Sequence, residues 1–234
     1  MSSPAASRPD VGVVLVAAGA GVRAGPGEPK QFRAILGVPM LLRALRPFTS
    51  HPEVLHVIVA LPPAYAERPP EWLGKLRGDR LGLVAGGVLR ADSVRAGLRA
   101  LSPEAGVVLV HDAARPFVSR DTIDVVIGRA RGGVGAVAAI PLSDTVKEVV
   151  EEHRIAKTVA RDHLWRAQTP QGFPRAMLDT AYAQLVTRDP PTDDAEVCER
   201  AGFPVEVVTD SPHNVKVTTA DDFRIAEALA RELQ

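Results

Sequence analysis

Five apolar runs of strand length recur along the chain, and they restrict its possible folds more than any other feature. Strands that are apolar on both faces belong to a parallel sheet that helices cover on both sides. Amphipathic helical patterns lie between several of the runs. We therefore expect an α/β fold with a doubly wound, mostly parallel sheet. The runs cover residues 11–17, 54–60, 81–85, 107–110 and 134–140.

Three helices can be placed from apolar periodicity and capping residues. Residues 93–101 carry their apolar side chains on one stripe, with Asp92 or Ser93 as the N-cap. Ser119 precedes a second pattern of the same kind. Residues 218–233 have the pattern of a capped amphipathic helix. We expect these helices to cover the sheet.

One segment interrupts the alternation of strands and helices. Residues 144–150 and 155–159 have strand character and flank the polar residues 151–154. This pattern is typical of a β-hairpin with an exposed tip. An isolated hairpin is barely stable in water, so it needs the main sheet or another subunit to pack against. We expect a protruding arm at about residues 142–163.

The remaining organisation is simple. The chain has no internal repeat, low-complexity tract or long linker. We expect one domain over residues 11–234 that carries the arm, preceded by a disordered tail over residues 1–10.

Charge and cysteine content exclude several classes of partner. Lysine and arginine total 28, as do aspartate and glutamate. The chain therefore lacks the excess of basic residues that would indicate a nucleic-acid partner. The single cysteine, Cys198, allows no internal disulfide, fits a reducing compartment, and is expected to be buried. The first residues do not resemble a signal peptide, and the apolar runs are too short to span a bilayer. We expect a cytoplasmic protein without a membrane or nucleic-acid partner.

The first strand leads into a glycine-rich loop with two possible functions. Gly19, Gly21 and Ala24 satisfy the loose dinucleotide pattern G-x-G-x-x-[G/A], which would suggest a nicotinamide dehydrogenase. However, the second strand ends without the acidic residue that a ribose needs. The loop also continues to Lys30 instead of entering a helix directly. It therefore favours binding of a triphosphate.

Two cations in this loop suit a triphosphate. Glycines let backbone N–H groups approach phosphate oxygens, while Arg23 supplies a planar fork and Lys30 a compact charge. The structural alternative is a tight strand-to-helix turn with two solvated cations. Further along the chain, Asp112 follows an apolar strand, at the edge where α/β sheets bind ligands. His111 precedes it and is expected to be a packed core histidine.

Five segments together resemble the 2-C-methyl-D-erythritol 4-phosphate cytidylyltransferase family, over about residues 11–233. The resemblance implies a Rossmann-like nucleotidyltransferase fold, use of CTP, a Mg²⁺ requirement, and a homodimer whose hairpin arms are exchanged. The implied reaction is transfer of CMP from CTP to methylerythritol phosphate, with release of pyrophosphate, in isoprenoid precursor synthesis. The segments are residues 15–32, 86–94, 111–116, 161–173 and 214–218.

The resemblance also implies roles for residues around the nucleotide. Arg23 and Lys30 would contact the triphosphate and stabilise the transition state. Cytosine would be recognised by main-chain groups and by the nearby Ser93, which the sequence also allows as a helix cap. Val88 stands where the family often has a polar residue. The implied nucleotide-binding residues are Ala17, Ala18, Gly19, Gly21, Gly87, Arg90, Ser93 and Asp112.

The acceptor phosphate needs its own cations and donors. By resemblance, Arg161 from the neighbour's arm and Lys216 supply the charges. Hydroxyl groups of Thr145, Thr169 and Thr192 would donate hydrogen bonds. The implied catalytic set is Arg23, Lys30, Arg161 and Lys216.

Asp112 and Arg115 complete the implied acceptor site. Asp112 is the candidate Mg²⁺ ligand, because this ion commonly uses one or two carboxylates beside phosphate oxygens. Arg115 has a structural ion pair as its alternative role, and Lys216 has an outward-facing position on a strand. Thr192 suits a helix N-cap equally well.

Three competing functions remain open from the sequence. The nearest is a cytidylyltransferase for another polyol phosphate, such as ribitol 5-phosphate, which shares the loop and the fold. A nicotinamide dehydrogenase is the second. The third is a non-catalytic nucleotide-binding regulator, which would be expected to have lost some of the cations that this chain retains.

Overall fold

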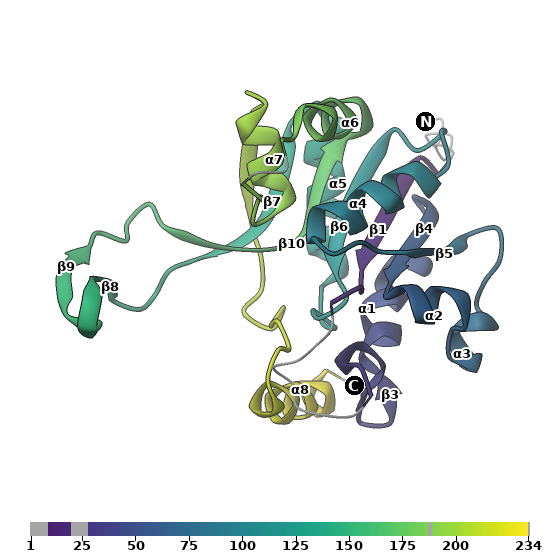
Figure 1. Ribbon diagram of the computed structural model, residues 1–234, viewed down its shortest axis with the longest axis horizontal. Coiled ribbons are helices and arrows are strands. Elements are labelled where there is room, and N and C mark those ends of the chain that lie inside the picture. The colour runs from purple at the N-terminus through teal and green to yellow at the C-terminus, as the bar shows by residue number, and fades with distance from the viewer. Residues whose placement is uncertain (1–8, 20–27, 187–188, 234) are drawn as a thin grey trace, which may run out of the picture.

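A seven-stranded sheet forms the centre of the computed structural model, which describes residues 9–19, 28–186 and 189–233. The strand order is β11-β7-β10-β6-β1-β4-β5 (Figure 1). Neighbouring strands are parallel, except that β10 runs antiparallel to both β6 and β7. The strands are β1 (Val11–Val16), β4 (Val54–Leu61), β5 (Leu81–Ala85), β6 (Val107–Asp112), β7 (Gly135–Pro141), β10 (Trp165–Pro174) and β11 (Val205–Thr209).

The predicted doubly wound, mostly parallel sheet is confirmed, and its five apolar runs correspond to β1, β4, β5, β6 and β7. Alternate residues of β1 belong to opposite faces: Val13 and Leu15 pack in one core cluster, and Val14 packs in the other. Both faces are therefore buried, as a continuous apolar run requires. The sequence analysis did not identify β10 or β11.

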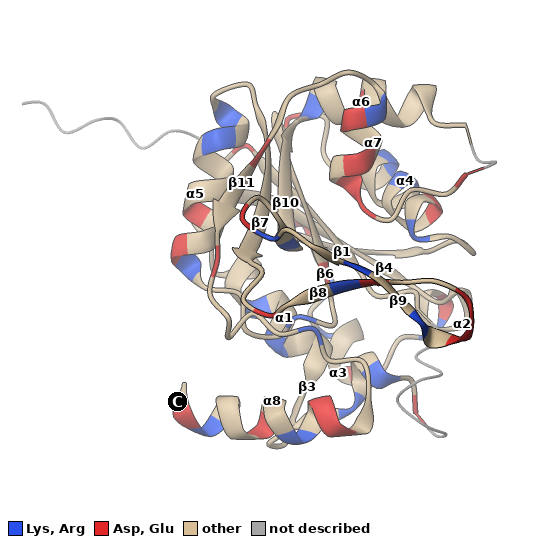
Figure 2. Cartoon of the chain, turned by 90° about the vertical axis from the view of Figure 1, so that its left-hand side faces the viewer, with Lys and Arg blue, Asp and Glu red and all other residues tan. Residues whose placement is uncertain are grey.

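Helices cover both faces of the sheet. The cluster around Val13 includes α1 (Met40–Thr49), α3 (Glu71–Gly74) and α5 (Arg120–Arg131), with α2 (Pro63–Glu67) packed beside it. The cluster around Val14 includes α4 (Arg90–Ala100), α6 (Arg175–Gln184) and α7 (Asp194–Arg200). Figure 2 shows α5 on one side of the sheet and α4, α6 and α7 on the other.

A smaller layer closes one end of the molecule. It contains α8 (Ala220–Glu232), the short helix η2 (Lys30–Phe32), and the ribbon of β2 (Ala34–Ile35) and β3 (Val38–Pro39). Met40, Val217 and Ala226 are among the buried residues of this layer. The predicted C-terminal helix is confirmed, with Thr219 as its N-cap in a capping box with Asp222.

Two predicted helix caps are wrong. Helix α4 begins at Arg90, so Ser93 lies inside it, and Asp92 accepts a hydrogen bond from the Leu89 amide at the true N-cap. Helix α7 is capped by Asp193, whose side chain accepts from the Glu196 amide, and not by Thr192. At α7, consecutive polar residues offer capping groups, and the apolar pattern alone does not choose between them. At α4, the N-cap is the apolar Leu89, which no capping pattern marks.

Other caps and the N-terminus follow more simply. Ser119 caps α5 as predicted, because its hydroxyl accepts from the Thr122 amide.

The expected tail lies mostly outside the described residues. Asp10, the last residue of that tail, is described, and its carbonyl accepts a hydrogen bond from the Gly106 amide. The domain boundaries stay a prediction. Among the helices in the described ranges, none has the length and apolar character that a bilayer crossing requires.

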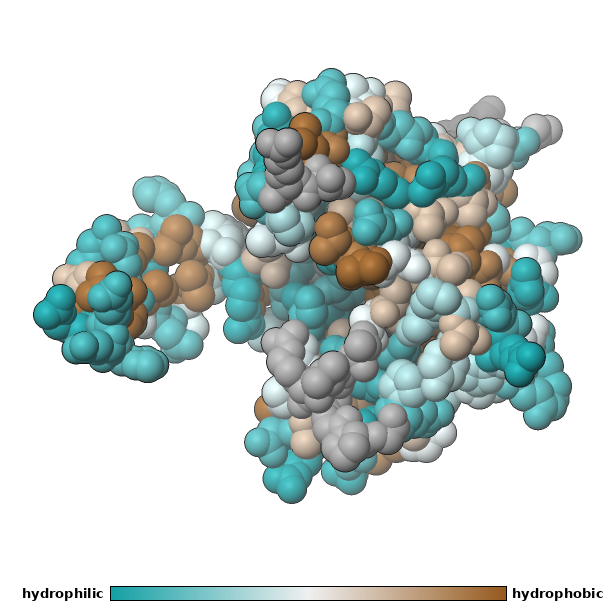
Figure 3. All heavy atoms as spheres, viewed as in Figure 1, coloured by the Kyte–Doolittle hydropathy of each residue, from teal (hydrophilic) through white to brown (hydrophobic). Residues whose placement is uncertain are grey.

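The predicted hairpin is confirmed as a separate two-stranded antiparallel sheet. It pairs β8 (Val146–Val149) with β9 (Ile155–Val159), and the turn η3 (Glu151–His153) joins them. Figure 1 shows this arm extending away from the body of the molecule. Apolar side chains are exposed on it (Figure 3), including Val149 at 50% and Ile155 at 58%.

Close packing of α4 on β1 generates a prediction about stability. A Cβ at Gly97 would lie 2.4 Å from Cγ1 of Val14, whereas one at Gly128 in α5 would meet nothing within 4 Å. We expect Gly97→Ala to lower the free energy of unfolding by about 1–3 kcal/mol through overpacking. The matched control Gly128→Ala should be neutral or stabilising by up to about 1 kcal/mol, because alanine is the better helix former. Urea denaturation of both variants measures this difference, and equal stabilities would contradict it.

Candidate active site

A cavity of about 330 Å³ lies at the carboxyl ends of β1 and β6. Its location follows from the parallel sheet, in which loops after neighbouring strands meet at one edge. Gly21 and Arg23 lie outside the described residues. The sequence-predicted residues that line this cavity are Ala17, Ala18, Gly19, Lys30, Gly87, Arg90, Ser93, Asp112 and Lys216.

A second cavity of about 230 Å³ shares three wall residues, Arg90, Asp112 and Lys216, with the first. The structure thus brings together most of the predicted acceptor residues beside the predicted nucleotide residues. Thr145 and Arg161 are the exceptions. The residues lining this cavity are Arg90, Asp112, Arg115, Ala167, Gln168, Thr169, Gln171, Thr192, Asp193 and Lys216.

Backbone groups form the part of the first cavity nearest α4. A Cβ at Gly86 would lie 2.4 Å from Cβ of Ala18, and one at Gly87 would lie 2.3 Å from Cβ of Asp92. Side chains at these two positions would therefore force the loop away from its neighbours. Ser93 is buried, and its hydroxyl accepts a 3.1 Å hydrogen bond from the Gly87 amide. The loop geometry leaves main-chain groups of residue 87 at the cavity wall.

Side chains from η2 hold the other part of the same cavity. Gln31 is buried and donates from Nε2 to the carbonyl of Ala17 at 2.9 Å, which anchors the end of the first strand's loop. Lys30 donates from Nζ to the carbonyl of Val217 at 2.9 Å. This contact joins residues 187 positions apart in the chain. The ammonium group of Lys30 consequently lies against the C-terminal segment, and Lys30 lines the first cavity.

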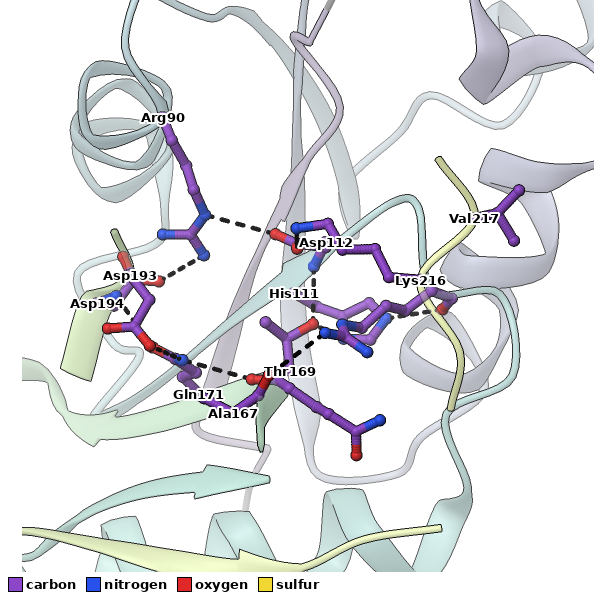
Figure 4. Close-up of polar contacts among 12 residues, drawn as sticks. Arg90, His111, Asp112, Ala167, Thr169, Gln171, Asp193, Asp194, Lys216 and Val217 are labelled. Carbon is purple, nitrogen blue, oxygen red and sulfur yellow. Dashed lines mark hydrogen bonds and ion pairs between the residues drawn. The ribbon is translucent and has the colours of Figure 1, made fainter. Parts of the chain in front are cut away.

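Asp112 lies between two cations in the wall that divides the cavities (Figure 4). Its Oδ2 is 2.7 Å from Nζ of Lys216, and its Oδ1 is 3.4 Å from Nε of Arg90. Burial alone would raise the pKa of Asp112, but the charges of Arg90 and Lys216 outweigh it and hold that pKa well below its usual range. Asp112 is therefore an anion at neutral pH. The outward strand position considered for Lys216 is wrong, because residues 215–217 form no strand and the ammonium group contacts Asp112.

His111 is fully buried, as expected, and its hydrogen bonds fix its tautomer. Nε2 lies 3.0 Å from the Arg115 carbonyl, which can only accept, so Nε2 carries the proton. Burial lowers the pKa of His111 to about 4, which keeps the ring neutral at pH 7. Nδ1 then accepts from the Thr169 hydroxyl at 2.9 Å. That hydroxyl in turn accepts from the Asp112 amide at 3.0 Å, so its one proton is directed at His111.

Arg115 is held by backbone carbonyl groups. Its Nη1 donates to the Asn214 carbonyl at 2.7 Å, and its Nη2 donates to the Ala167 carbonyl at 3.5 Å. Asn214 is itself buried, and it donates from Nδ2 to the Thr169 carbonyl and to Oδ2 of Asp210. Asn214 thus connects Arg115 and Thr169, which both line the second cavity.

Three buried polar residues beside the site were missed by the sequence analysis. Gln171 accepts at Oε1 from the amides of Asp194 and Ala195, and donates from Nε2 to Asp193. Asp194 forms a 2.7 Å ion pair with Nη2 of Arg90. Asn214 completes the group. Polar residues within a buried strand such as β10 were the available signal for Gln171, whereas no local pattern marks the burial of Asp194.

The arm residues lie elsewhere. Thr145 and Arg161 are exposed, and within the described part of this chain they line neither cavity. The Arg161 guanidinium donates to the carbonyl of Ser143, at the base of the arm. Trp165, the first residue of β10, is 37% exposed in the single chain. Cys198 is buried as expected, and burial raises the pKa of its thiol to about 12.

A metal site made by the protein alone is absent from the described ranges, which contain no cluster of three or more His, Cys, Asp or Glu side chains suited to a metal ion. Asp112 is the carboxylate shared by both cavities, and Asp193 lines the second. This donor set fits an ion of the Mg²⁺ type only if ligand oxygens complete its coordination, as phosphate groups commonly do.

Comparisons with known proteins identify the family of this chain. The family model described as 2-C-methyl-D-erythritol 4-phosphate cytidylyltransferase matches residues 11–232. The chain is 39% identical to the enzyme of that name from Syntrophus aciditrophicus, with 96% of this chain and 97% of that protein covered. It is 44% identical to the one from Streptomyces coelicolor, with 92% of this chain and 83% of that protein covered.

Solved structures give the same result. The crystal structure of 2-C-methyl-D-erythritol 4-phosphate cytidylyltransferase from Thermus thermophilus matches with a TM-score of 0.75 and 34% identity, over 93% of this chain and 98% of that chain. The 4-diphosphocytidyl-2C-methyl-D-erythritol synthase from Anaerococcus prevotii matches with a TM-score of 0.82 and 26% identity, over 96% and 100% respectively. The fold, the paired cavities and these relatives together place the chain in the 2-C-methyl-D-erythritol 4-phosphate cytidylyltransferase family.

Proposed function

We propose that this protein transfers the cytidylyl group of CTP to 2-C-methyl-D-erythritol 4-phosphate. The products are 4-diphosphocytidyl-2-C-methyl-D-erythritol and pyrophosphate, and the reaction serves isoprenoid precursor synthesis. The observation that carries the proposal is the pair of adjoining cavities whose common wall contains Arg90, Asp112 and Lys216. Two phosphorylated substrates that must meet at one phosphorus atom need such an arrangement.

The chemistry requires positioning and charge neutralisation more than proton transfer. A phosphate monoester has a second pKa near 6, so the acceptor oxygen is already an anion at pH 7. That oxygen attacks the α-phosphorus of CTP, the new P–O bond forms, and the bond to the bridging oxygen breaks as its electron pair leaves with pyrophosphate. No general base is needed, and the neutral His111 is already committed to Arg115 and Thr169.

The first cavity is assigned to CTP. Main-chain groups of Ala17, Ala18 and Gly87, with Ser93 behind them, would read the donor and acceptor pattern of cytosine. Lys30 from η2 would neutralise the triphosphate, and Arg23 shares this role in the proposal. Preorganised donors of this kind stabilise the charge that develops in a transition state.

The second cavity is assigned to the acceptor phosphate. Lys216 and Arg115 would supply its positive charge, and the Thr192 hydroxyl would contribute a hydrogen bond. The role of Thr169 as a donor stays a prediction. Its present contacts also support a different task, in which it holds the Asp112 amide against His111.

The proposed active enzyme is a homodimer in which each site receives the arm of its neighbour. Thr145 and Arg161 lie outside the cavities of their own chain, and the exposed apolar residues of the arm need a surface to cover them. Val149 and Ile155 are the most exposed of these. An exchanged arm would place Arg161 beside the acceptor phosphate of the partner chain.

A divalent cation, Mg²⁺ in the first instance, is part of the proposal. Asp112 would hold it together with phosphate oxygens, and the ion would supply charge neutralisation at the triphosphate. We also propose that the protein acts in the cytoplasm, with the buried thiol of Cys198 suited to a reducing compartment.

Pyrophosphate release tests the proposed function directly. With CTP, Mg²⁺ and methylerythritol phosphate we expect stoichiometric pyrophosphate and the diphosphocytidyl product, which phosphorus NMR can identify. Parallel reactions replace methylerythritol phosphate by ribitol 5-phosphate, or CTP by UTP, and should be much slower. Preferred turnover of ribitol 5-phosphate would assign a different acceptor, and pyrophosphate release without any acceptor would contradict the transfer.

Loss of the cation in the shared wall should slow the chemical step. We expect Lys216→Met to reduce kcat by about 10²–10³-fold, which is typical for removal of one transition-state donor. Lys75→Met is the matched control, because Lys75 is an exposed residue at the C-cap of α3 that pairs with Glu71 at 2.5 Å and lines neither cavity. Steady-state kinetics of both variants test the role, and unchanged kcat for Lys216→Met would remove this residue from the catalytic set.

Exchange of the arm can be tested by subunit complementation. Arg161→Ala should impair acceptor use far more than CTP binding, whereas Arg154→Ala at the arm tip should leave both unchanged. If Arg161 serves the partner's site, mixed dimers of Arg161→Ala and Lys216→Met contain one intact site, and an equal mixture should regain about a quarter of wild-type activity for a symmetric dimer. An arm that serves its own chain leaves both sites of the mixed dimer defective, so no recovery would rule out the exchange.

A further inference from the structure

A buried ion pair joins the two segments that line the two cavities. Nη2 of Arg90 lies 2.7 Å from Oδ2 of Asp194. Arg90 is the first residue of α4, directly after the loop that lines the first cavity, and Asp194 is the first residue of α7, directly after Thr192 and Asp193 in the second. The pair therefore spans the space between the proposed nucleotide and acceptor segments.

Asp194 is held in place from several directions. Its side chain is fully buried, and its Oδ1 accepts a 2.6 Å hydrogen bond from the Tyr182 hydroxyl. Its backbone amide donates to Oε1 of Gln171 at 3.0 Å. A buried carboxylate is costly unless it is paired and hydrogen-bonded. Oδ1 is hydrogen-bonded to Tyr182, whereas the buried Oδ2 has the charge of Arg90 beside it but no hydrogen bond of regular geometry. Asp194 thus provides a fixed anchor for the guanidinium group of Arg90.

The anchored guanidinium is the start of a row of alternating charges. From Asp194 the contacts lead to Arg90, then to Asp112 at 3.4 Å, and then from Asp112 to Lys216 at 2.7 Å (Figure 4). The last three residues are the wall that the two cavities share. Asp194 itself is not among the described residues that line either cavity. The side-chain carboxylate of Asp194 contacts the shared wall through Arg90.

A role in folding alone does not explain this placement. Buried ion pairs contribute little net stability compared with apolar side chains of the same size, so stability is a weak reason for burying these charges. A separate half-buried cation of the same layer, Arg175, donates to the carbonyl of Leu98 and to the carboxylate of Asp179, and it lines neither cavity. The Arg90–Asp194 pair differs from Arg175 because Arg90 is part of the wall that the two cavities share.

We propose that Asp194 is a positioning residue that holds Arg90, and through it Asp112 and Lys216, at the spacing that brings the two substrates together. This inference rests on the proposed function of the two cavities. Under this inference, the buried carboxylate of Asp194 affects the binding of both substrates, although the carboxylate contacts neither of them. Neutralising Asp194 frees the guanidinium to turn toward Asp112 or toward a bound phosphate, and the wall then loses its set position.

The test is Asp194→Asn, which keeps the shape of the side chain and removes its charge. We expect kcat to fall about 10- to 100-fold, the size of effect that a misplacement of about 1 Å produces. The KM for methylerythritol phosphate and the calorimetric Kd for CTP should both rise severalfold. All measurements are made on the full-length protein well below the Tm of the variant, so that only folded enzyme is compared.

Arg175→Gln is the control for destabilisation, because it removes a half-buried cation on the same face of the sheet. It should lower the Tm and leave kcat, KM and the Kd for CTP at wild-type values. If Asp194→Asn lowers the Tm but behaves like this control in all three constants, Asp194 has only a structural role and the inference is wrong. If wild-type protein binds CTP without turnover, the proposed reaction fails, while the Kd for CTP in Asp194→Asn still decides the positioning role.

A second variant covers the case in which Asp194→Asn does not fold. Tyr182→Phe withdraws one hydrogen bond from Asp194 and leaves both charges in place. We expect a smaller effect in the same direction, with lower kcat and weaker CTP binding together. Wild-type constants in a folded Tyr182→Phe protein would then overturn the proposal.

Discussion

The carboxylate of Asp112 lies within contact distance of two cations, and the arrangement of both cavities depends on it. Arg90 and Lys216 come from segments far apart in the chain, and like charges at such a site would repel without an anion between them. Asp112 is fixed at the end of β6, and its backbone amide is held by Thr169. A rigid strand thus determines where two long, adaptable side chains are placed. This is the reason that a positively charged site can exist in a folded chain before any phosphate arrives.

The antiparallel strand β10 supplies the second requirement, a polar wall inside a buried sheet. It lies between β6 and β7, and its pairing with β7 is irregular between Ala167 and Gln171. In this interval Gln168 and Thr169 are buried, and each makes hydrogen bonds to its surroundings. Interruption of regular pairing frees side chains and backbone groups to serve the cavity, as bulges beside binding sites often do.

The fold was largely predictable, because each apolar run specifies a strand buried on both faces. The strand β10 was not predictable, because Gln168 and Gln171 interrupt the apolar pattern that would indicate a buried strand. The candidate site was predictable where a residue follows a strand directly, as Asp112 does, or belongs to a motif, as Lys30 does. Contacts such as that between Arg115 and Asn214 join residues 99 positions apart, and no local periodicity encodes them. The Asp194 side chain shows the same limit, because neighbouring acidic residues look alike in sequence and only the fold decides which one is buried.

If each site needs the partner's arm of β8 and β9, the fraction of active enzyme depends on dimerisation, and therefore on protein concentration. The two strands of the arm form a sheet of their own, so the unpaired edges and the exposed Val149 and Ile155 are not covered by any segment that the structure describes. At low expression or high dilution, chains would separate and each pocket would lack its borrowed groups. Specific activity would then climb with enzyme concentration, and the liberated hairpin would be the part most open to proteolysis and to misassociation.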